Sequence, residues 1–255
     1  MEGFEINIRD THVCRLKKAL YGLKQAPRAS YARMQAYILR IGFVKCYSDA
    51  NLYIKVMKNE PTIILLYVDD LFIRGVERKI LKYKKMLTIE FGMKYIRLMN
   101  YYLILEVWKK PDDIYPGQGK YIIKMLHKSN AMDSKLMTTP MITNLKKLRR
   151  SDASLTDPTN YHNLLGSLMY LVNTRIDICF TVNVLSQFQL EPRHDHWLTA
   201  KHILRYLCGT IHHCLKYHGK EVKLTCFTDS DWGKSETNGR STIGGCFNFA
   251  PAMIS

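Results

Sequence analysis

Hydrophobic and polar positions follow two different periods along the first half of the chain. Apolar side chains recur every three to four positions from Tyr31 to Ile41 and Gly42 follows, so residues 27–41 are predicted to form a helix. Short, nearly continuous apolar runs are typical of buried strands. The remaining predicted elements are strands over residues 51–56 and 62–73, a basic helix over 77–91, a strand over 101–108 and a helix over 120–130.

The second half divides at a polar stretch. Residues 132–158 carry few apolar side chains and include two basic pairs at 146–147 and 149–150, so they are predicted to be a connecting segment. The elements predicted beyond it are helices within residues 161–190 and 196–207 and strands over 222–229 and 242–249. Helices alternate with short apolar strands in the first part, which matches an α+β fold, and the last two strands indicate a new unit that begins near residue 221.

The amino-acid composition indicates which class of partner the chain would bind. The 255 residues are 47% hydrophobic, enough for one large or two small globular domains, and 38 Lys and Arg against 22 Asp and Glu give a formal net charge of +16. This excess favours a polyanionic partner, with nucleic acid ahead of an anionic membrane surface. No apolar run is long enough to span a membrane, so no membrane partner is expected.

The positive charge is concentrated near the N-terminus. No acidic residue lies between Thr11 and Ser48. The cations of this run are Arg15, Lys17, Lys18, Lys24, Arg28, Arg33, Arg40 and Lys45. Phosphate contact is preferred over a merely solvated face, because an unbalanced run repels itself without an anion. The interleaved Tyr21, Tyr31 and Tyr37 could stack on bases, although core packing is the favoured interpretation at this helical spacing.

The cysteines predict a reduced, intracellular protein. There are seven, an odd number, without a CxxC pair, and no signal peptide precedes them. A cluster of soft ligands at Cys208, His212, His213, Cys214 and His218 has no standard zinc spacing. Zinc is disfavoured there, because much of this stretch is predicted to be a strand, whose side chains alternate between faces.

Two adjacent acids stand out at residues 67–70, Tyr-Val-Asp-Asp. Apolar runs on both sides predict a hairpin with Asp69 and Asp70 at its tip. Paired carboxylates repel each other and are stabilised by divalent cations, which can bridge a triphosphate and an attacking hydroxyl. The alternative is an ordinary turn without metal, since Asp is a preferred turn residue.

A second motif lies upstream at residues 20–28, Leu-Tyr-Gly-Leu-Lys-Gln-Ala-Pro-Arg, whose proline would open a helix. Together the two motifs resemble the reverse transcriptase of Ty1/copia-type LTR retrotransposons. The resemblance covers nearly the whole chain. Further motifs follow in the family's order: Thr-Pro-Met at 139–141, Gly-Ser-Leu-Met-Tyr-Leu at 166–171, Thr-Arg-Ile-Asp-Ile at 174–178, His-Trp at 196–197, Leu-Arg-Tyr-Leu-Cys-Gly-Thr at 204–210 and Thr-Asp-Ser-Asp-Trp at 228–232.

The resemblance implies a fold and a domain order. It implies a right-hand polymerase palm, truncated at its N-terminal side, with a helical thumb or connection and then an incomplete RNase H-like α/β unit. The predicted domains are a fingers and palm remnant over residues 1–131, a connecting and thumb region over 132–220, and the start of an RNase H-like domain over 221–255.

Site roles are also implied by the resemblance. Asp69 would ligate Mg²⁺ or Mn²⁺ with Asp70 supporting it, and Tyr67 would lie near the primer terminus. The expected partners are an RNA template, a DNA primer and dNTPs. The upstream motif supplies the residues of the nucleotide and template pocket, namely Gly22, Gln25 and Pro27, with Lys24 and Arg28 as phosphate contacts.

The last motif implies a second metal position. Asp229 would be the first metal-binding acid of the RNase H remnant, and Asp231 is the weaker candidate. The alternative for Asp229 is an exposed carboxylate at a strand end. RNase H activity is not expected, because a two-metal nuclease needs several carboxylates and the chain stops at Ser255 before the family's remaining acids.

Polymerase activity is also expected to be impaired. The family's third palm aspartate lies upstream of a segment resembling residues 2–5, so this chain begins just after it, and loss of one ligand weakens a two-metal site. The chain also departs from the family's motifs at Ser30 (usually Trp), Ile96-Arg97 (Leu-Gly), Ile104 (Gly) and Ile176 (Pro). A β-branched residue is costly where glycine served a positive φ. We therefore expect an RNA-directed DNA polymerase fragment with little activity, or alternatively a non-enzymatic nucleic-acid-binding relic.

Overall fold

The computed structural model describes residues 24–68, 70–95, 99–141, 148, 152–219, 223–230, 241, 243–249 and 252–253. The chain divides into two compact units, Met1–Ile96 (the first unit) and Arg97–Ser255 (the second unit). Both mix helices with antiparallel sheets, which confirms the mixed α and β content. The predicted domain boundaries near residues 131 and 220 stay predictions.

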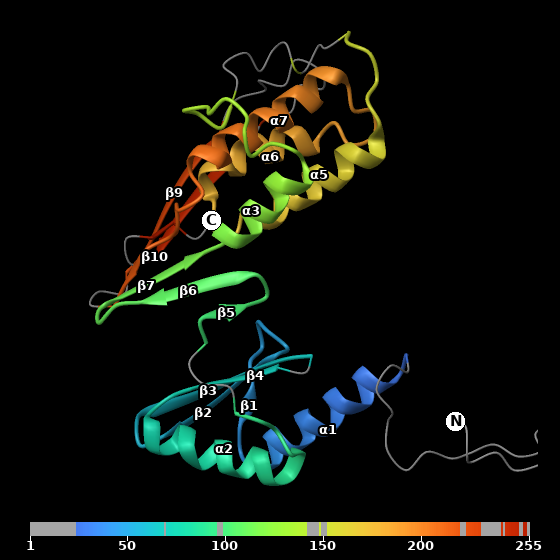
Figure 1. The fold of residues 1–255 in the computed structure, drawn as a ribbon. Coiled ribbons are helices and arrows are strands. Elements are labelled where there is room, and N and C mark those ends of the chain that lie inside the picture. Colours follow the sequence, from blue (N-terminus) through green and yellow to red (C-terminus); the bar gives the residue numbers. More distant parts are fainter. Residues whose placement is uncertain are drawn as a thin grey trace, which may run out of the picture. The chain divides into compact units, whose positions relative to one another are not determined.

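The first unit is a four-stranded antiparallel sheet with two helices (Figure 1). Its strands follow chain order as β1 (Val44–Lys45), β2 (Leu52–Met57), β3 (Glu60–Tyr67) and β4 (Asp70–Arg74), and its helices are α1 (Ala26–Arg40) and α2 (Glu77–Phe91). Residues from both helices and the central strands form one core, so α1 and α2 cover the same face of the sheet. The core residues are Ile38, Phe43, Tyr53, Ile64, Leu66 and Tyr83.

Local sequence explains the helix ends in this unit. Pro27 lies in the first turn of α1, where a missing N–H costs nothing. Helix α2 ends at Gly92, which has a φ of 65° and donates its N–H to the Thr88 carbonyl. Glycine adopts this left-handed conformation without a Cβ penalty. The two helices predicted over residues 27–41 and 77–91 are therefore confirmed.

The second unit joins a four-stranded antiparallel sheet to a cluster of helices (Figure 1). The strands are β5 (Tyr101–Tyr102), β6 (Leu105–Lys109), β7 (Asp113–Gly117) and β8 (Tyr217–His218), and they lie in that order. The helices are α3 (Gly119–Lys128), α5 (Pro158–Leu171), the 3₁₀ turn η1 (Ile176–Ile178), α6 (Cys179–Ser186) and α7 (His194–Gly209). Their apolar faces share one large core that includes Leu126, Leu168, Val182 and Leu207.

A separate three-stranded antiparallel sheet ends the chain. It comprises β9 (Leu224–Ser230), β10 (Ile243–Phe249) and β11 (Ala252–Met253), with β10 in the middle. The strands predicted over residues 222–229 and 242–249 are confirmed. No helix of the described part of the chain is long and apolar enough to cross a membrane.

Three predictions of where a helix or strand begins and ends were wrong. The strand predicted over residues 101–108 is a hairpin, because Tyr102 pairs with Leu105 across a two-residue turn. The helical stretch predicted over 161–190 breaks between α5 and η1, where Arg175 makes tertiary contacts instead of continuing the helix. The stretch 208–218, predicted to be largely strand, contains the end of α7, a turn and irregular chain, and only β8 lies in a sheet. The alternation argument against zinc therefore does not apply. The sequence also missed β1, β7 and β11.

The turn between β5 and β6 holds Leu103 and Ile104 at φ values of 45° and 68°. Both central residues of a two-residue type I′ hairpin turn need positive φ, which explains the strong preference for Asn-Gly there. Ile104 occupies the position where the family motif has glycine. The sequence-based concern about a β-branched residue at this position is therefore confirmed by the backbone.

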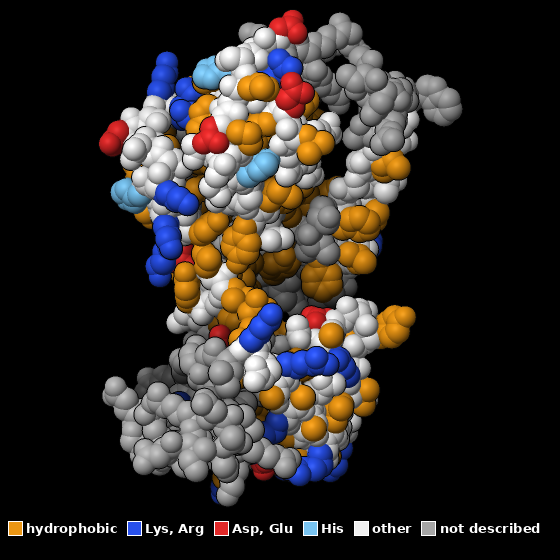
Figure 2. Space-filling view, turned by 90° about the vertical axis from the view of Figure 1, so that its right-hand side faces the viewer, with side chains coloured by type: hydrophobic (Ala, Val, Ile, Leu, Met, Phe, Trp, Pro, Cys, Tyr) orange, Lys and Arg blue, Asp and Glu red, His pale blue; other side chains and the backbone are white. Residues whose placement is uncertain are grey.

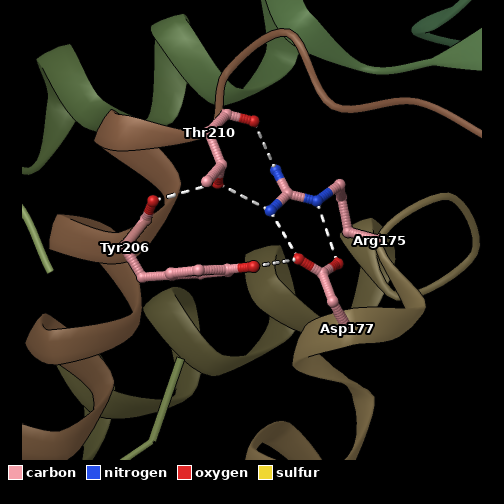
Figure 3. A network of polar contacts seen from close by, with 4 residues as sticks. All are labelled: Arg175, Asp177, Tyr206 and Thr210. Atoms are coloured by element: carbon pink, nitrogen blue, oxygen red, sulfur yellow. Dashed lines mark hydrogen bonds and ion pairs between the residues drawn. The ribbon is translucent and has the colours of Figure 1, made fainter. Parts of the chain in front are cut away.

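A buried polar network closes the break between α5 and α6 (Figure 3). Arg175 is 2% exposed and donates to both Asp177 and Thr210. Tyr206 of α7 donates to Asp177 at 2.6 Å and accepts, through its backbone carbonyl, the hydroxyl of Thr210 at 2.9 Å. The network therefore ties the connection after α5 to the C-terminal end of α7.

Candidate functional site

The acidic motif lies where β3 turns into β4. Tyr67 pairs with Asp70, so the two residues between them form the hairpin tip. Asp70 is the exposed first residue of β4, while Asp69 lies outside the described residues. The prediction that the motif forms a hairpin turn is confirmed, and the metal-binding role of its acids stays a prediction.

Burial on one face of β3 fixes the register of this hairpin. Ile64 and Leu66 are 0% and 2% exposed, and they alternate with partly buried neighbours along the strand. A slip of one residue would bring both to the opposite face of the sheet. The register in turn keeps Tyr67 and Val68 largely exposed, at 41% and 62%. The tip is therefore presented to solvent by a well-anchored strand pair.

Val68 has an unusual backbone for its residue type. Its φ is 50°, in the left-handed region that β-branched residues rarely adopt. The neighbouring hairpin between β2 and β3 turns through Lys58 and Asn59 at φ values of 52° and 58°, without a β-branched residue. A strained residue at a loop tip is a feature of functional sites, and the cost is about 1–3 kcal/mol.

The upstream motif is gathered at the start of α1. Gln25 is the N-cap residue and Pro27 lies in the first turn. The side chains of Lys24, Gln25, Pro27 and Arg28 are all exposed there. Gly22 lies outside the described residues. The exposed start of α1 is therefore free to contact a ligand, although the pocket role of this motif stays a prediction.

The described cations of the N-terminal run are partly neutralised. Arg33 and Arg40 both lie 3.7 Å from Glu90 of α2. On the face drawn in Figure 2, Lys and Arg side chains lie among hydrophobic ones rather than in one continuous patch. The core interpretation is confirmed for Tyr31, which packs on the first unit's core and hydrogen-bonds to Tyr53 at 3.1 Å. Tyr37 packs edge-on against Phe91.

The second predicted metal position is Asp229. Asp229 lies on β9 opposite Gly244 and is exposed, and Asp231 lies outside the described residues. Among the described residues, no group of three or more His, Cys, Asp or Glu side chains is placed to hold a metal ion. In the Cys and His cluster, Cys208 donates to the Met132 carbonyl at 3.2 Å and His218 pairs with Asp113 at 2.7 Å.

His218 belongs to a polar cluster around Asp113 that joins β7 to β8. Asp113 also accepts from Tyr115 at 2.9 Å and lies 3.1 Å from the Lys216 ammonium. Hydrogen bonds from His218, Tyr115 and Lys216 lower the pKa of Asp113 to about 2. No local pattern predicts this cluster, because Asp113 and Tyr115 meet Lys216 and His218 only through tertiary contact across about 105 positions of the chain.

A match to a protein family identifies the domain that contains the β3–β4 hairpin. Residues 1–143 match the profile of the reverse transcriptase (RNA-dependent DNA polymerase) family. The chain belongs to the reverse transcriptase family. The matched residues of this reverse transcriptase domain include both predicted motifs and the whole of the first unit.

Several similar proteins are Pol polyproteins of Ty1/copia-type transposons. The chain is 38% identical to the retrovirus-related Pol polyprotein from transposon RE2 of Arabidopsis thaliana, over 95% of the chain and 17% of that protein. It is 35% identical to the Pol polyprotein from transposon TNT 1-94 of Nicotiana tabacum, over 100% of the chain and 20% of that protein. A transposon Ty5-1 protein of Saccharomyces cerevisiae is 32% identical, over 95% and 80%.

The extent of these matches shows how much of each polyprotein the chain represents. It spans about a sixth of the RE2 polyprotein. No solved structure matches the chain. The recognition of a Ty1/copia-type reverse transcriptase from its motifs is confirmed by these relatives.

Proposed function

We propose that the chain supplies the metal-binding tip of an RNA-directed DNA polymerase that acts by two-metal nucleotidyl transfer. The observation that carries the proposal is the pairing of Tyr67 with Asp70, which makes the acidic motif the turn of a hairpin with Val68 and Asp70 exposed beside it. Asp69 would ligate Mg²⁺ or Mn²⁺, and Asp70 would support it. The ions would bridge the triphosphate and the primer hydroxyl and stabilise the charge of in-line displacement.

The other residues position substrates in this proposal. The half-exposed Tyr67 would lie beside the primer terminus. Lys24 and Arg28 would contact phosphates at the start of α1, and Gly22, Gln25 and Pro27 would shape the nucleotide and template pocket. The family membership supports nucleic acid as the substrate class, with an RNA template, a DNA primer and dNTPs as the specific partners.

Two further assignments complete the proposal. Asp229, exposed on β9, would be the first metal ligand of an RNase H-like unit. The expected location is intracellular, because the seven cysteines are odd in number and contain no CxxC pair.

One observation favours a second function, that of a nucleic-acid-binding relic without polymerase activity. Ile104 occupies a left-handed turn position where the family motif has glycine. A strained substitution of this kind is tolerated more easily in a chain that is no longer selected for synthesis. Such a relic would keep salt-sensitive binding to nucleic acid through its formal net charge of +16.

Primer extension on an RNA template with Mg²⁺ or Mn²⁺ separates the two functions. The variants are Asp69→Asn and Asp70→Asn, with Asp133→Asn as the matched control, because Asp133 is an exposed loop acid of the second unit. Extension that is lost in both hairpin variants and kept in the control supports the polymerase. Absence of extension with retained binding to the same primer and template supports the relic. Extension that survives both hairpin substitutions would refute the proposed role of these acids.

A further inference from the structure

A cavity of about 540 Å³ lies within the second unit. Its floor is one face of the β6–β7 hairpin, where Trp108 pairs with Tyr115 and Glu106 with Gly117. The residues after α7, from Ile211 to Cys214, form a wall. The volume falls in the range of about 300–1,000 Å³ that is usual for small-ligand sites.

Gly117 gives this cavity its depth beside the indole ring. A Cβ on Gly117 would lie 3.1 Å from the ring atom Cζ3 of Trp108 and 3.1 Å from Cβ of Cys214. Trp108 is nevertheless 50% exposed, so part of its ring is available to a ligand. A flat group can therefore lie against an aromatic face there, which favours a planar ring over a branched aliphatic one.

Cations surround this aromatic floor. The Lys110 ammonium lies 5.4 Å from the centroid of the Tyr115 ring, and the Lys216 ammonium lies 5.9 Å from it. Lys120 contributes a third ammonium, on a side chain that is 71% exposed. The surroundings of the cavity thus combine an exposed indole with several ammonium groups, which suits a planar ligand carrying negative charge.

The acids nearby are already engaged. Glu106 accepts the backbone N–H of Lys120 at 2.9 Å and lies 3.3 Å from its ammonium. Asp113 accepts from Tyr115 and His218. Glu106 therefore pairs with Lys120, and Asp113 pairs with Lys216 at 3.1 Å, so neither acid balances the positive charge of Lys110. An anion at the cavity mouth would complement this excess.

We propose that this cavity binds an unpaired base of single-stranded nucleic acid. The base stacks on Trp108, and the flanking phosphates contact Lys110 and Lys120. Aromatic side chains and lysines are the combination that single-strand-binding proteins use, because every base has a π face. The proposal rests on nucleic acid as the substrate class of the proposed function, but it adds a site outside the acidic hairpin, since every lining residue belongs to the second unit.

Binding of a short fluorescent oligo(dA), compared with an abasic oligomer of equal length, tests the site. The abasic oligomer keeps the phosphates and lacks the bases. Trp108→Ala is expected to weaken oligo(dA) binding about tenfold and to leave abasic binding unchanged. Trp108→Phe, which keeps a stacking ring, is expected to retain most of the oligo(dA) affinity, and retained abasic binding shows that Trp108→Ala is folded.

A matched control comes from the first unit. Tyr95 is 59% exposed and lies 3.4 Å from the Lys84 ammonium, measured to the ring centroid, but it lines no part of this cavity. Tyr95→Ala is expected to change neither the affinity for oligo(dA) nor the affinity for the abasic oligomer. Equal loss of oligo(dA) and abasic binding in Trp108→Ala, or no loss in either, would overturn the proposal. Efficient displacement of oligo(dA) by free dAMP would overturn the assignment to a strand.

Primer extension and oligonucleotide binding, measured on the same protein, distinguish this proposal from the polymerase proposal. Asp133→Asn is expected to leave oligo(dA) binding unchanged, because Asp133 is exposed and lines no part of the cavity. Failure of primer extension with a base-dependent effect of Trp108→Ala would refute only the polymerase. Extension together with equal oligo(dA) and abasic affinities in the unaltered chain would refute only the base-binding cavity.

Discussion

Arg175 donates two hydrogen bonds to the carboxylate of Asp177, from Nε to Oδ1 at 3.0 Å and from Nη2 to Oδ2 at 2.7 Å (Figure 3). The planar fork of a guanidinium fits a carboxylate in this way, and an ammonium does not. Arg175 also donates to the carbonyl and the hydroxyl of Thr210. Arg175 thus satisfies polar groups from two separate segments at once.

Replacement of Arg175 by lysine should destabilise the second unit. A single ammonium cannot make all four of these hydrogen bonds, and unmet buried polar groups remain. We expect the free energy of unfolding to fall by about 2–4 kcal/mol, somewhat less than for a fully buried pair because Asp177 is 35% exposed. Urea unfolding measures the change. Arg193→Lys is the control, since its partner Glu191 is 64% exposed, and a change below about 1 kcal/mol is expected.

Replacement of Ile104 by glycine should stabilise the protein. The φ of 68° costs an L-residue about 1–2 kcal/mol, and glycine removes that cost. The side chain is 36% exposed, and loss of the apolar area that it buries offsets part of this gain. We expect the free energy of unfolding to rise by about 1 kcal/mol in thermal or urea unfolding.

Ile114→Gly is the matched control for this turn. Ile114 has the same residue type on β7 of the same sheet and is 40% exposed, but its backbone is extended. Glycine there should destabilise by about 0.5–1 kcal/mol. Destabilisation by both substitutions would contradict the view that the turn conformation is the source of strain.

Two Gly→Ala substitutions should have opposite signs. Gly92 ends α2 at a φ of 65°, and no heavy atom would lie within 4 Å of a new Cβ, so the cost of alanine is purely conformational. We expect a loss of about 1 kcal/mol. Gly166 lies inside α5 with equally open space, and alanine there should stabilise by about 0.5–1 kcal/mol through helix propensity. Thermal unfolding of both variants gives the comparison.

Stability should fall in mild acid because of His196. Its Nδ1 accepts the N–H of Arg193 at 3.0 Å, so Nε2 donates to the Leu148 carbonyl at 2.9 Å in the neutral ring. Burial lowers the pKa of His196 below 6.5, which outweighs the opposing hydrogen bond to Leu148. The unfolded state then binds the proton more tightly, so the stability contributed by the neutral ring is present above pH 6.5 and lost as the pH falls through the folded-state value.

The pH effect is measured by urea unfolding at pH 7.5 and pH 5.5. His196→Gln should be less stable at pH 7.5 and should lose less stability between the two values than the unaltered chain. His162→Gln is the control, because His162 is an exposed residue on α5. An unchanged pH dependence in His196→Gln would show that another group governs acid unfolding.

The sequence alone was sufficient for the elements whose local signals agree. Helix α2 was predicted at its observed bounds, and the structure shows that it ends at Gly92, which adopts a positive φ. The β3–β4 hairpin was predicted because two apolar runs flank a short polar tip. The motifs at residues 20–28 and 67–70 identified the reverse transcriptase family, since their order and spacing are written in the chain itself.

Only the tertiary structure decided the features that depend on distant partners. The break after α5 is invisible in its apolar pattern, because Arg175 is held by Thr210, which lies 35 positions further along. The cavity lined by Trp108 likewise needs the residues after α7 to form its wall. Local propensity and periodicity act over a few neighbouring residues, whereas buried polar contacts and cavities form only when separate segments meet. The chain therefore determined its family and most of its elements, and folding decided which of its polar side chains became structural and which surfaces stayed open to a ligand.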